Sequence, residues 1–360
     1  MDALKNIYTR ELLDSFAVKV RREYASFDER QFLETVFDDA WESRELKERM
    51  RHISAALGKF LPGDYEKAVE ILERLAGECK GFPYLFFPDF VEVFGLDHWN
   101  TSVHALKKFT PSSSSEFAIR PFIERDQDRM LKTMLEWTSD PDEHVRRLAS
   151  EGCRPRLPWA APLRRLKAQP DPLLPILEAL KADPSDYVRR SVANNLNDIS
   201  KDHPELVLKI AQEWMGHDPR TDWILKHGCR TLLKKGDPEA LQLFGFGGAG
   251  LSESVKVRNM TVQPQDIRIG EEVVFSFVLS SSDPCTFRLQ FGIDYVKANG
   301  KTSQKLFHLS EKKQFSGNET ISRKLSFRDL TTRKHYPGKH RLAILVNGAE
   351  VAEVSFEVRG

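Results

Sequence analysis

Apolar residues before residue 244 recur at the three- and four-residue spacing of amphipathic helices. Three such faces lie near the N-terminus: Leu4, Ile7, Tyr8, Leu12 and Phe16; then Phe32, Val36, Phe37 and Trp41; then Val69, Ile71, Leu72, Leu75 and Ala76. Because one side of a helix collects positions i, i+3 and i+4, each set predicts a helix packed on a core. The alternation typical of strands is not evident here, so this part is predicted to be helical.

A repeat is visible in the second half of this helical part. The segment 140–147 (DPDEHVRR) resembles 183–190 (DPSDYVRR), and a weaker copy begins at Asp218-Pro219. Asp is a favoured N-cap and Pro fits the first helical position, so we expect each Asp-Pro to open a helix. A period of about 40 residues with two helices per copy is typical of a HEAT-like α-solenoid.

After residue 250 the pattern changes to period two. About seven short strands are predicted, at 255–262, 272–279, 286–293, 305–309, 320–327, 341–346 and 351–358. The pairs Asn299-Gly300, Pro337-Gly338 and Asn347-Gly348 are turn formers between them. This is typical of a β-sandwich of about 100 residues with an immunoglobulin-like layout, although the antibody Cys…Trp…Cys pattern is absent.

The predicted fold is therefore mainly α, with a HEAT-like α-solenoid over 1–244 and a small immunoglobulin-like β-sandwich over 251–360. The glycines at 245, 247 and 250 spell G-x-G-x-x-G between them. A dinucleotide site needs a strand before this motif and a helix after it. Here the order is reversed, so 245–250 is interpreted as a flexible linker.

Composition narrows the class of protein. With 360 residues, 40% hydrophobic and 30% charged, the chain can bury a core in two domains. The formal net charge is only +1, but 251–360 holds 17 Lys and Arg against 12 Asp and Glu. No apolar run reaches the roughly 18 residues of a membrane span, and the charged N-terminus is not a secretory signal. We expect a cytoplasmic protein with no membrane partner.

The cysteines do not indicate a metal site. Cys79, Cys153, Cys229 and Cys285 form no C-x-x-C pair and no zinc-ligand spacing. In a reducing cytosol we expect buried free thiols, and the sequence predicts neither a metal nor a cofactor.

The segment 144–167 is unusually basic, with seven Arg or Lys and the single acid Glu151. A basic stripe on a repeat helix and its following loop is suited to phosphates, although a solvated charged face is the plainer alternative. The predicted DNA-binding residues are Arg147, Arg154, Arg156, Arg190, Lys201 and His203, with Arg333 and Lys334 from a basic loop at 331–339.

A carboxylate opposes the binding of a polyanion, so Glu151 either pairs with a neighbouring arginine or faces a group that becomes positive. Asp198, in the next repeat, shares that face or caps a helix end. Trp159 lies in a proline-rich loop and either presents its indole outward or anchors the loop in the core. Glu116 follows four serines, where it forms either part of the site or a capping box with Ser113.

Three segments carry a resemblance to a known family. They are 115–122 (SEFAIRPF), 145–159 (VRRLASEGCRPRLPW) and 191–204 (SVANNLNDISKDHP). At these residues the chain resembles the AlkC branch of the HEAT-like-repeat alkylpurine DNA glycosylases, which are relatives of AlkD. The resemblance covers nearly the whole chain, because one form of the family also ends in an immunoglobulin-like domain.

The resemblance implies a monofunctional DNA glycosylase that removes 3-methyladenine and 3-methylcytosine from alkylated double-stranded DNA without flipping the base. It also implies Glu116, Glu151, Asp198 and Trp159 as the catalytic set, and we expect a monomer. An N3-methylated base is already cationic, so the sugar, which becomes an oxocarbenium ion as the base departs, is the group that anions can stabilise.

The main alternative is a non-enzymatic HEAT scaffold that binds nucleic acid or protein, since such stacks are often scaffolds. A metal-dependent nuclease built on the acids is a weaker alternative because no ligand cluster is evident. The β-domain loop is predicted to touch the opposite side of the duplex from the helical part.

Overall fold

The computed structural model describes residues 4–246, 254–330 and 333–360. Within these residues the chain forms two compact units. The first comprises the described residues of Met1–Asp202 and Gly216–Gly228, and the second comprises those of His203–Met215 and Cys229–Gly360. None of the described helices has the length and apolar content needed to cross a membrane.

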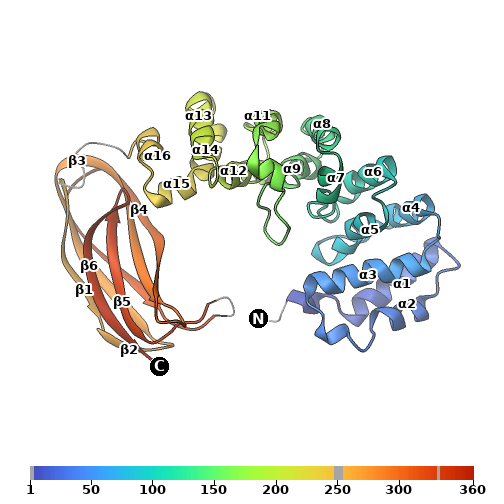
Figure 1. The fold of residues 1–360 in the computed structure, drawn as a ribbon, viewed down its shortest axis with the longest axis horizontal. Helices are drawn as coiled ribbons and strands as arrows, with labels where there is room; N and C mark the ends of the chain where they lie inside the picture. Colours follow the sequence, from blue (N-terminus) through green and yellow to red (C-terminus); the bar gives the residue numbers. More distant parts are fainter. Residues whose placement is uncertain (1–3, 247–253, 331–332) are drawn as a thin grey trace. The chain divides into compact units, whose positions relative to one another are not determined.

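The first unit is built from helices (Figure 1). Its α-helices are α1 (Arg10–Glu23), α2 (Glu29–Val36), α3 (Leu46–Phe60), α4 (Tyr65–Leu75), α5 (Phe86–Phe94), α6 (Trp99–Phe109), α7 (Arg120–Arg125), α8 (Gln127–Trp137), α9 (Glu143–Glu151), α10 (Arg164–Ala168), α11 (Leu174–Leu180), α12 (Asp186–Ile199) and α14 (Pro219–Gly228). Short 3-10 helices lie at η1 (Leu4–Ile7), η2 (Trp41–Ser43), η3 (Phe82–Leu85) and η4 (Asp171–Leu173).

The three predicted apolar faces are helical, but two of them are divided. The third face is confirmed as α4, which begins after the N-cap Asp64. The first is split because Thr9 caps a new helix, its hydroxyl accepting a hydrogen bond from the Leu12 amide. The second is split because α2 ends at Val36 and η2 begins at Trp41. Local capping therefore interrupts a periodicity that continues through the break.

The Asp-Pro pairs play a different role from the predicted one in two copies of the repeat. The carboxylates of Asp140 and Asp183 accept hydrogen bonds from backbone amides two residues on, and α9 and α12 begin only after this turn. The prediction that each Asp-Pro opens a helix is wrong here, because Asp also favours such side-chain turns. It is confirmed in the third copy, where α14 starts at Pro219.

Equivalent arginines close these two turns. Arg146 donates to the carbonyls of residues 140 and 141, and Arg189 donates to those of residues 183 and 184. Arg146 also forms a two-bond ion pair with Asp183 at 2.7 and 3.1 Å. The first copy of the repeat is thereby fixed to the second, which sets the spacing between α9 and α12.

The second unit combines helices with the strands of the chain (Figure 1). Its described elements are α13 (Pro204–Trp214), α15 (Arg230–Lys235), α16 (Pro238–Leu243), β1 (Val255–Gln263), β2 (Asp266–Arg268), β3 (Glu272–Val296), β4 (Thr302–Ser326), β5 (Gly338–Val346) and β6 (Ala349–Arg359). The domain limits at 244 and 251 stay a prediction, because this unit includes helices that precede them.

The strands form one hydrogen-bonded path, in the order β1-β3-β5-β6-β2, with β4 paired to β3. The prediction of about seven short strands is wrong, since six are described and β3 and β4 each run for 25 residues. The polar residues near 281–285 create register shifts in the β3–β4 ladder and do not form a turn. A bulge of this kind bends a strand without ending it.

The β3–β4 pair joins two parts of the sheet around one core. β1 pairs with the first half of β3, and β5 pairs with its second half. Apolar side chains from both parts meet in a single cluster that includes Phe275, Phe287 and Phe356. The turns at Asn299-Gly300 and Asn347-Gly348 are confirmed, and each glycine has the positive φ that such tight turns require.

Within the second unit, α15 and α16 are attached to one end of the sheet. Gly236 and Gly348 approach so closely that a Cβ on Gly348 would lie 2.5 Å from the Cα of Gly236. Of the predicted linker, Gly245 and Phe246 are described, and Phe246 is buried against the helices. Its remaining residues, 247–250, lie outside the described residues.

We expect Gly348→Ala to lower the stability of the second unit by about 2–3 kcal/mol, because it adds a backbone clash to the strain of a left-handed residue. The matched control is Gly300→Ala, which has a similar φ of 74° but open space around its Cα. Urea denaturation of both variants checks this, and equal losses would contradict it.

Candidate functional site

Two buried carboxylates lie at the ends of neighbouring helices. Glu151 is the last residue of α9 and Asp198 lies in the last turn of α12, with exposed fractions of 5% and 2%. The C-terminal end of a helix carries partial negative charge, which is unfavourable for an acid. Both side chains therefore need cations beside them, and the structure supplies these.

Arg154 joins the two acids. Its Nη1 donates to Glu151 Oε1 at 2.6 Å, and its Nε donates to Asp198 Oδ2 at 2.9 Å. Only 6% of Arg154 is exposed. Burial by itself lowers the pKa of Arg154, but the attraction of Glu151 and Asp198 outweighs it, so the net shift is upward. One guanidinium thus holds two carboxylates that are far apart in the sequence.

The network continues in both directions. Arg147 Nη2 lies 3.3 Å from Glu151 Oε1, and its Nη1 bonds to the carboxylate of Glu116. At the other end, Lys201 Nζ donates to Asp198 Oδ1 at 3.0 Å. Three acids thus alternate with three cations, which keeps the site close to neutral overall.

Neutral side chains orient the acids further. Ser191 donates to Glu151 Oε2 at 2.6 Å, so both oxygens of this carboxylate have partners. Ser114 donates to Glu116 at 2.9 Å. The ring of Tyr187 lies 4.8 Å from the guanidinium carbon of Arg147, within the range of a cation–π contact.

Trp159 is held on the loop that follows Arg154. Its residue is 62% exposed and its φ is 62°, in the left-handed region that tryptophan rarely adopts. Lys47 Nζ, from α3, donates to the Trp159 carbonyl at 2.8 Å. The alternative that Trp159 anchors the core does not fit this exposure, because the indole is presented outward.

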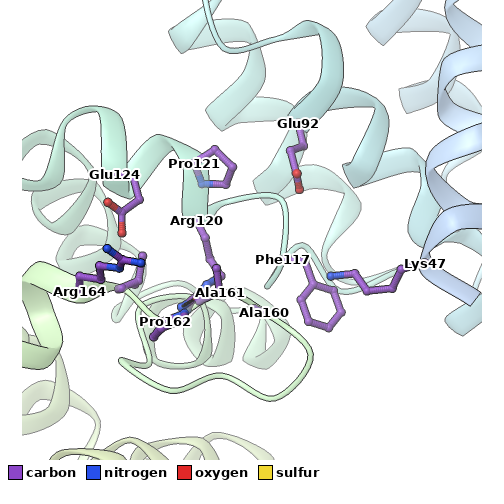
Figure 2. Close-up of a pocket in the computed structure, with 11 residues that line it drawn as sticks. Lys47, Glu92, Phe117, Arg120, Pro121, Glu124, Ala160, Ala161, Pro162 and Arg164 are labelled. Atoms are coloured by element: carbon purple, nitrogen blue, oxygen red, sulfur yellow. Dashed lines mark hydrogen bonds between the residues drawn. The ribbon is translucent and has the colours of Figure 1, made fainter.

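A pocket of about 480 Å³ lies beside this loop (Figure 2). Its lining includes Lys47 and Phe117 on one side and Arg120, Ala161 and Arg164 on the other. Lys47 Nζ also lies 4.4 Å from the centre of the Phe117 ring. In Figure 2 the Arg120 side chain extends from α7 toward Ala161. The Trp159 loop therefore forms one wall of a preformed hollow.

The structure brings together Glu116, Glu151 and Asp198, but not as free anions. Glu151 pairs with two neighbouring arginines, Arg147 and Arg154. Glu116 forms no capping box with Ser113, whose hydroxyl has no hydrogen-bond partner among the residues that the structure describes. The carboxylate of Asp198 binds side chains of Arg154 and Lys201, so its role differs from a helix-end cap.

The five predicted DNA-binding residues of the first unit divide into two groups. Arg154 is buried and Arg147 is largely shielded, and both are bonded to carboxylates, which leaves them poorly placed to contact phosphates. The side chains of Arg156, Arg190 and Lys201 are 36%, 66% and 36% exposed, and they pair with Asp202, Asp186 and Asp198. A count of charges in a segment does not distinguish these two situations.

Three further predicted residues belong to the second unit. His203 directly precedes α13, and Lys334 is exposed. Arg333 lies 5.6 Å from the centre of the Tyr295 ring. Thr331 and Thr332, at the start of the predicted basic loop, lie outside the described residues.

Sequence reasoning missed Arg120, Lys47 and Ser191 as parts of the site. Arg120 and Ser191 both fall inside the segments that carry the resemblance, but their residue types alone indicate no role. Lys47 lies more than a hundred residues from Trp159, and nothing in the sequence relates the two. In the part of the chain that the structure describes, no group of three His, Cys, Asp or Glu side chains is arranged to hold a metal ion.

Comparison with family models identifies the class. Residues 112–232 match a model described as DNA alkylation repair enzyme, and 256–360 match the C-terminal immunoglobulin-like domain of the uncharacterised protein YhaZ. The three acids of the site and Trp159 all fall inside the first match. The chain thus combines a DNA alkylation repair part with an immunoglobulin-like part.

Two relatives extend over the full length. YhaZ of Bacillus subtilis (strain 168) is 48% identical over 360 residues, covering 99% of this chain and 100% of that protein. The alkylpurine DNA glycosylase AlkC of Pseudomonas fluorescens, solved with DNA containing an abasic site analog, is 41% identical, with a TM-score of 0.95 and 100% of both chains covered. The chain belongs to the AlkC family of alkylpurine DNA glycosylases.

We expect Arg154→Met to destabilise the first unit by about 3–5 kcal/mol, because it leaves Glu151 and Asp198 buried without their shared cation. Arg156→Met is the matched control, since it removes an ion pair at the surface and should cost less than about 1 kcal/mol. Urea denaturation followed by far-ultraviolet circular dichroism measures both. Similar losses for the two variants would show that the Arg154 bridge contributes no more to stability than the surface ion pair of Arg156.

Proposed function

We propose that this protein is a monofunctional DNA glycosylase that excises 3-methyladenine and 3-methylcytosine from alkylated double-stranded DNA. The observation that carries the proposal is the Arg154 bridge, which joins Glu151 to Asp198 at the start of the loop that carries the exposed Trp159. The AlkC relative supports it, because its DNA contained an abasic site analog, and base excision leaves an abasic site.

The leaving base determines which catalytic groups are useful. A base methylated at N3 is cationic before the reaction and needs little help from a general acid. As the glycosidic bond lengthens, positive charge moves to the deoxyribose, and an oriented water completes the hydrolysis. Fixed negative charge near this sugar lowers the barrier because it interacts more strongly with the transition state than with the ground state. Glu116, Glu151 and Asp198 supply that charge.

The size of the effect is limited by the cations. A carboxylate about 4 Å from a unit positive charge, at an effective dielectric of about 20, contributes roughly 4 kcal/mol. Arg147, Arg154 and Lys201 offset part of this attraction, and the cationic base is already attracted in the ground state. Each acid therefore contributes less than the roughly 10³-fold in rate that this energy allows. The cations also hold the carboxylates in place, so these side chains need no reorganisation during the reaction.

Trp159 supplies a second source of stabilisation. An indole face against the developing cation gives a cation–π contact worth roughly 0.5–2 kcal/mol. The outward position of Trp159 suits contact with a nucleotide that remains in the duplex, which agrees with excision without base flipping. A normal, neutral nucleotide gains little from these groups because its base is a poor leaving group.

Phosphate binding is assigned to the basic side chains that solvent can reach. Arg156, Arg190 and Lys201 serve the first unit, while His203, Arg333 and Lys334 serve the second. These contacts position the DNA and carry no sequence information. They must also offset the roughly 1–6 kcal/mol needed to bend a duplex.

The central test of the proposal is Glu151→Gln. We expect release of 3-methyladenine from duplex DNA to slow by roughly 10²-fold in single-turnover assays, because a neutral amide cannot stabilise the cationic sugar. Affinity for a duplex with an abasic-site analogue should change much less. Glu143→Gln, at the exposed N-terminal end of the same helix, is the control and should retain the original rate.

If the unaltered protein binds the methylated duplex but releases no base, the proposal is wrong and a nucleic-acid-binding scaffold is favoured. A panel with 3-methylcytosine and 7-methylguanine in place of 3-methyladenine tests the preference for N3-methylated bases. Rapid release of 7-methylguanine together with slow release of 3-methyladenine would contradict that preference.

The second unit is tested by charge reversal. We expect Arg333→Glu with Lys334→Glu to weaken duplex binding roughly tenfold or more at low salt and to flatten its salt dependence, because fewer counterions are released. The double variant Lys297→Glu with Lys301→Glu, at exposed positions flanking the Asn299-Gly300 turn of the same unit, is the charge-matched control. Unchanged affinity in the double variant would remove this loop from the DNA-binding surface. Truncation at residue 251 is less informative, because it would remove the sheet to which α15 and α16 of the second unit are attached.

A further inference from the structure

Arg120 is a buried arginine at the start of α7, only 5% exposed. Its Nη1 donates to the carbonyls of Gly152 and Arg154 at 3.0 and 2.8 Å. Its Nη2 donates to the carbonyl of Ala161 at 2.6 Å. All three acceptors belong to one segment, the loop 152–161 that begins at the end of α9 and carries Trp159.

The side chain has an unusual set of partners. Within the described residues, no Asp or Glu lies at ion-pair distance from Arg120, and its hydrogen bonds go to backbone carbonyls. Burial lowers the pKa of Arg120 to about 10. Burying a cation without an anion is unfavourable, so the contacts that remain have to be strong and well directed.

The positions of the acceptors indicate what this arrangement does. Gly152 and Arg154 lie at the start of the loop, and Ala161 lies near its end, so one planar guanidinium closes the loop at its base. Arg154 is also the residue whose side chain joins Glu151 to Asp198. Arg120 therefore contacts, through one group, both the backbone of the acid-bridging residue and the segment that presents the indole.

We propose that Arg120 is a positioning residue that fixes Trp159 relative to Glu151 and Asp198. It touches neither acid directly and acts through the loop backbone. Lys47 adds a second anchor by donating to the Trp159 carbonyl. This inference rests on the proposed role of Trp159 in the glycosylase reaction, because the placement of the indole matters only if the indole acts.

The test is a double-mutant cycle in the full-length protein, with single-turnover release of 3-methyladenine as the readout. Arg120→Met should slow release by roughly 10- to 100-fold, since a displacement of about 1 Å in a catalytic group has an effect of this size. In a Trp159→Phe background the same substitution should slow release less than about threefold. Arg120→Lys should give an intermediate rate, because an ammonium reaches fewer of the three carbonyls.

The matched control is Arg125→Met. Arg125 lies on the same helix and also donates to a backbone carbonyl, that of Leu96, but outside the loop. Arg125→Met should leave the rate of release unchanged in both the original and the Trp159→Phe background. An equal loss from Arg120→Met with and without the indole would show a general structural effect and overturn the inference.

A second measurement needs no catalytic activity. Trypsin cleavage after Arg156 is measured under native conditions, with the fragments identified by mass spectrometry. This cleavage reports whether the loop opens, because Leu157, on the other side of the bond, is buried. Arg120→Met should accelerate this cleavage at least tenfold over Arg125→Met. Unchanged cleavage would overturn the inference even if the glycosylase proposal holds.

The two proposals fail in different ways. A Trp159→Phe variant with the original rate contradicts the role of the indole, and the cleavage experiment then decides on Arg120 alone. If Arg120→Met does not fold, Lys47→Met replaces it in the cycle, with a smaller expected loss that again depends on Trp159. Additive losses in that cycle would count against loop positioning.

Discussion

The contact on which the site depends is the one between Arg154 and two carboxylates. Glu151 and Asp198 belong to different helices and would repel each other if left alone in a poorly polar environment. A shared guanidinium turns that repulsion into a link between α9 and α12. The ties from Arg146 to Asp183 fix the same pair of helices at their other ends. The geometry of the proposed site and the packing of the repeats are therefore maintained by the same kind of interaction.

Much of the fold follows from simple periodicity. The apolar spacing predicts helices before residue 244 and strands after residue 250, because each period places one side of an element on a core. It does not predict where elements begin and end. Asp140 and Asp183 form turns ahead of their helices, although Asp before Pro equally suits a cap. The polar residues near 281–285 bulge within β3, although the same residues suit a turn. Both outcomes are decided by neighbouring segments.

The site, like the fold, could be predicted only in part from the sequence. The isolated acid Glu151 in a basic segment was detectable from the sequence, and so was the proline-rich setting of Trp159. The direction of each arginine was not, because a charged residue on an amphipathic helix can face solvent or a buried partner. Arg147 and Arg154 face inward only because acids from other elements meet them there. Arg120 gave no signal at all, since its partners are carbonyls, which every residue has.

The alternation of three acids with three cations has a consequence for how the protein responds to ionic strength. Opposite charges a few ångströms apart cancel at long range, and mobile ions screen the buried part of the set, Glu151, Arg154 and Asp198, only weakly. Binding of the duplex relies on solvated side chains, and its affinity falls as the salt concentration rises because counterion release then contributes less. Ionic strength therefore affects two steps differently. It changes the fraction of protein that is bound to DNA, but it has almost no effect on the rate at which a bound lesion reacts.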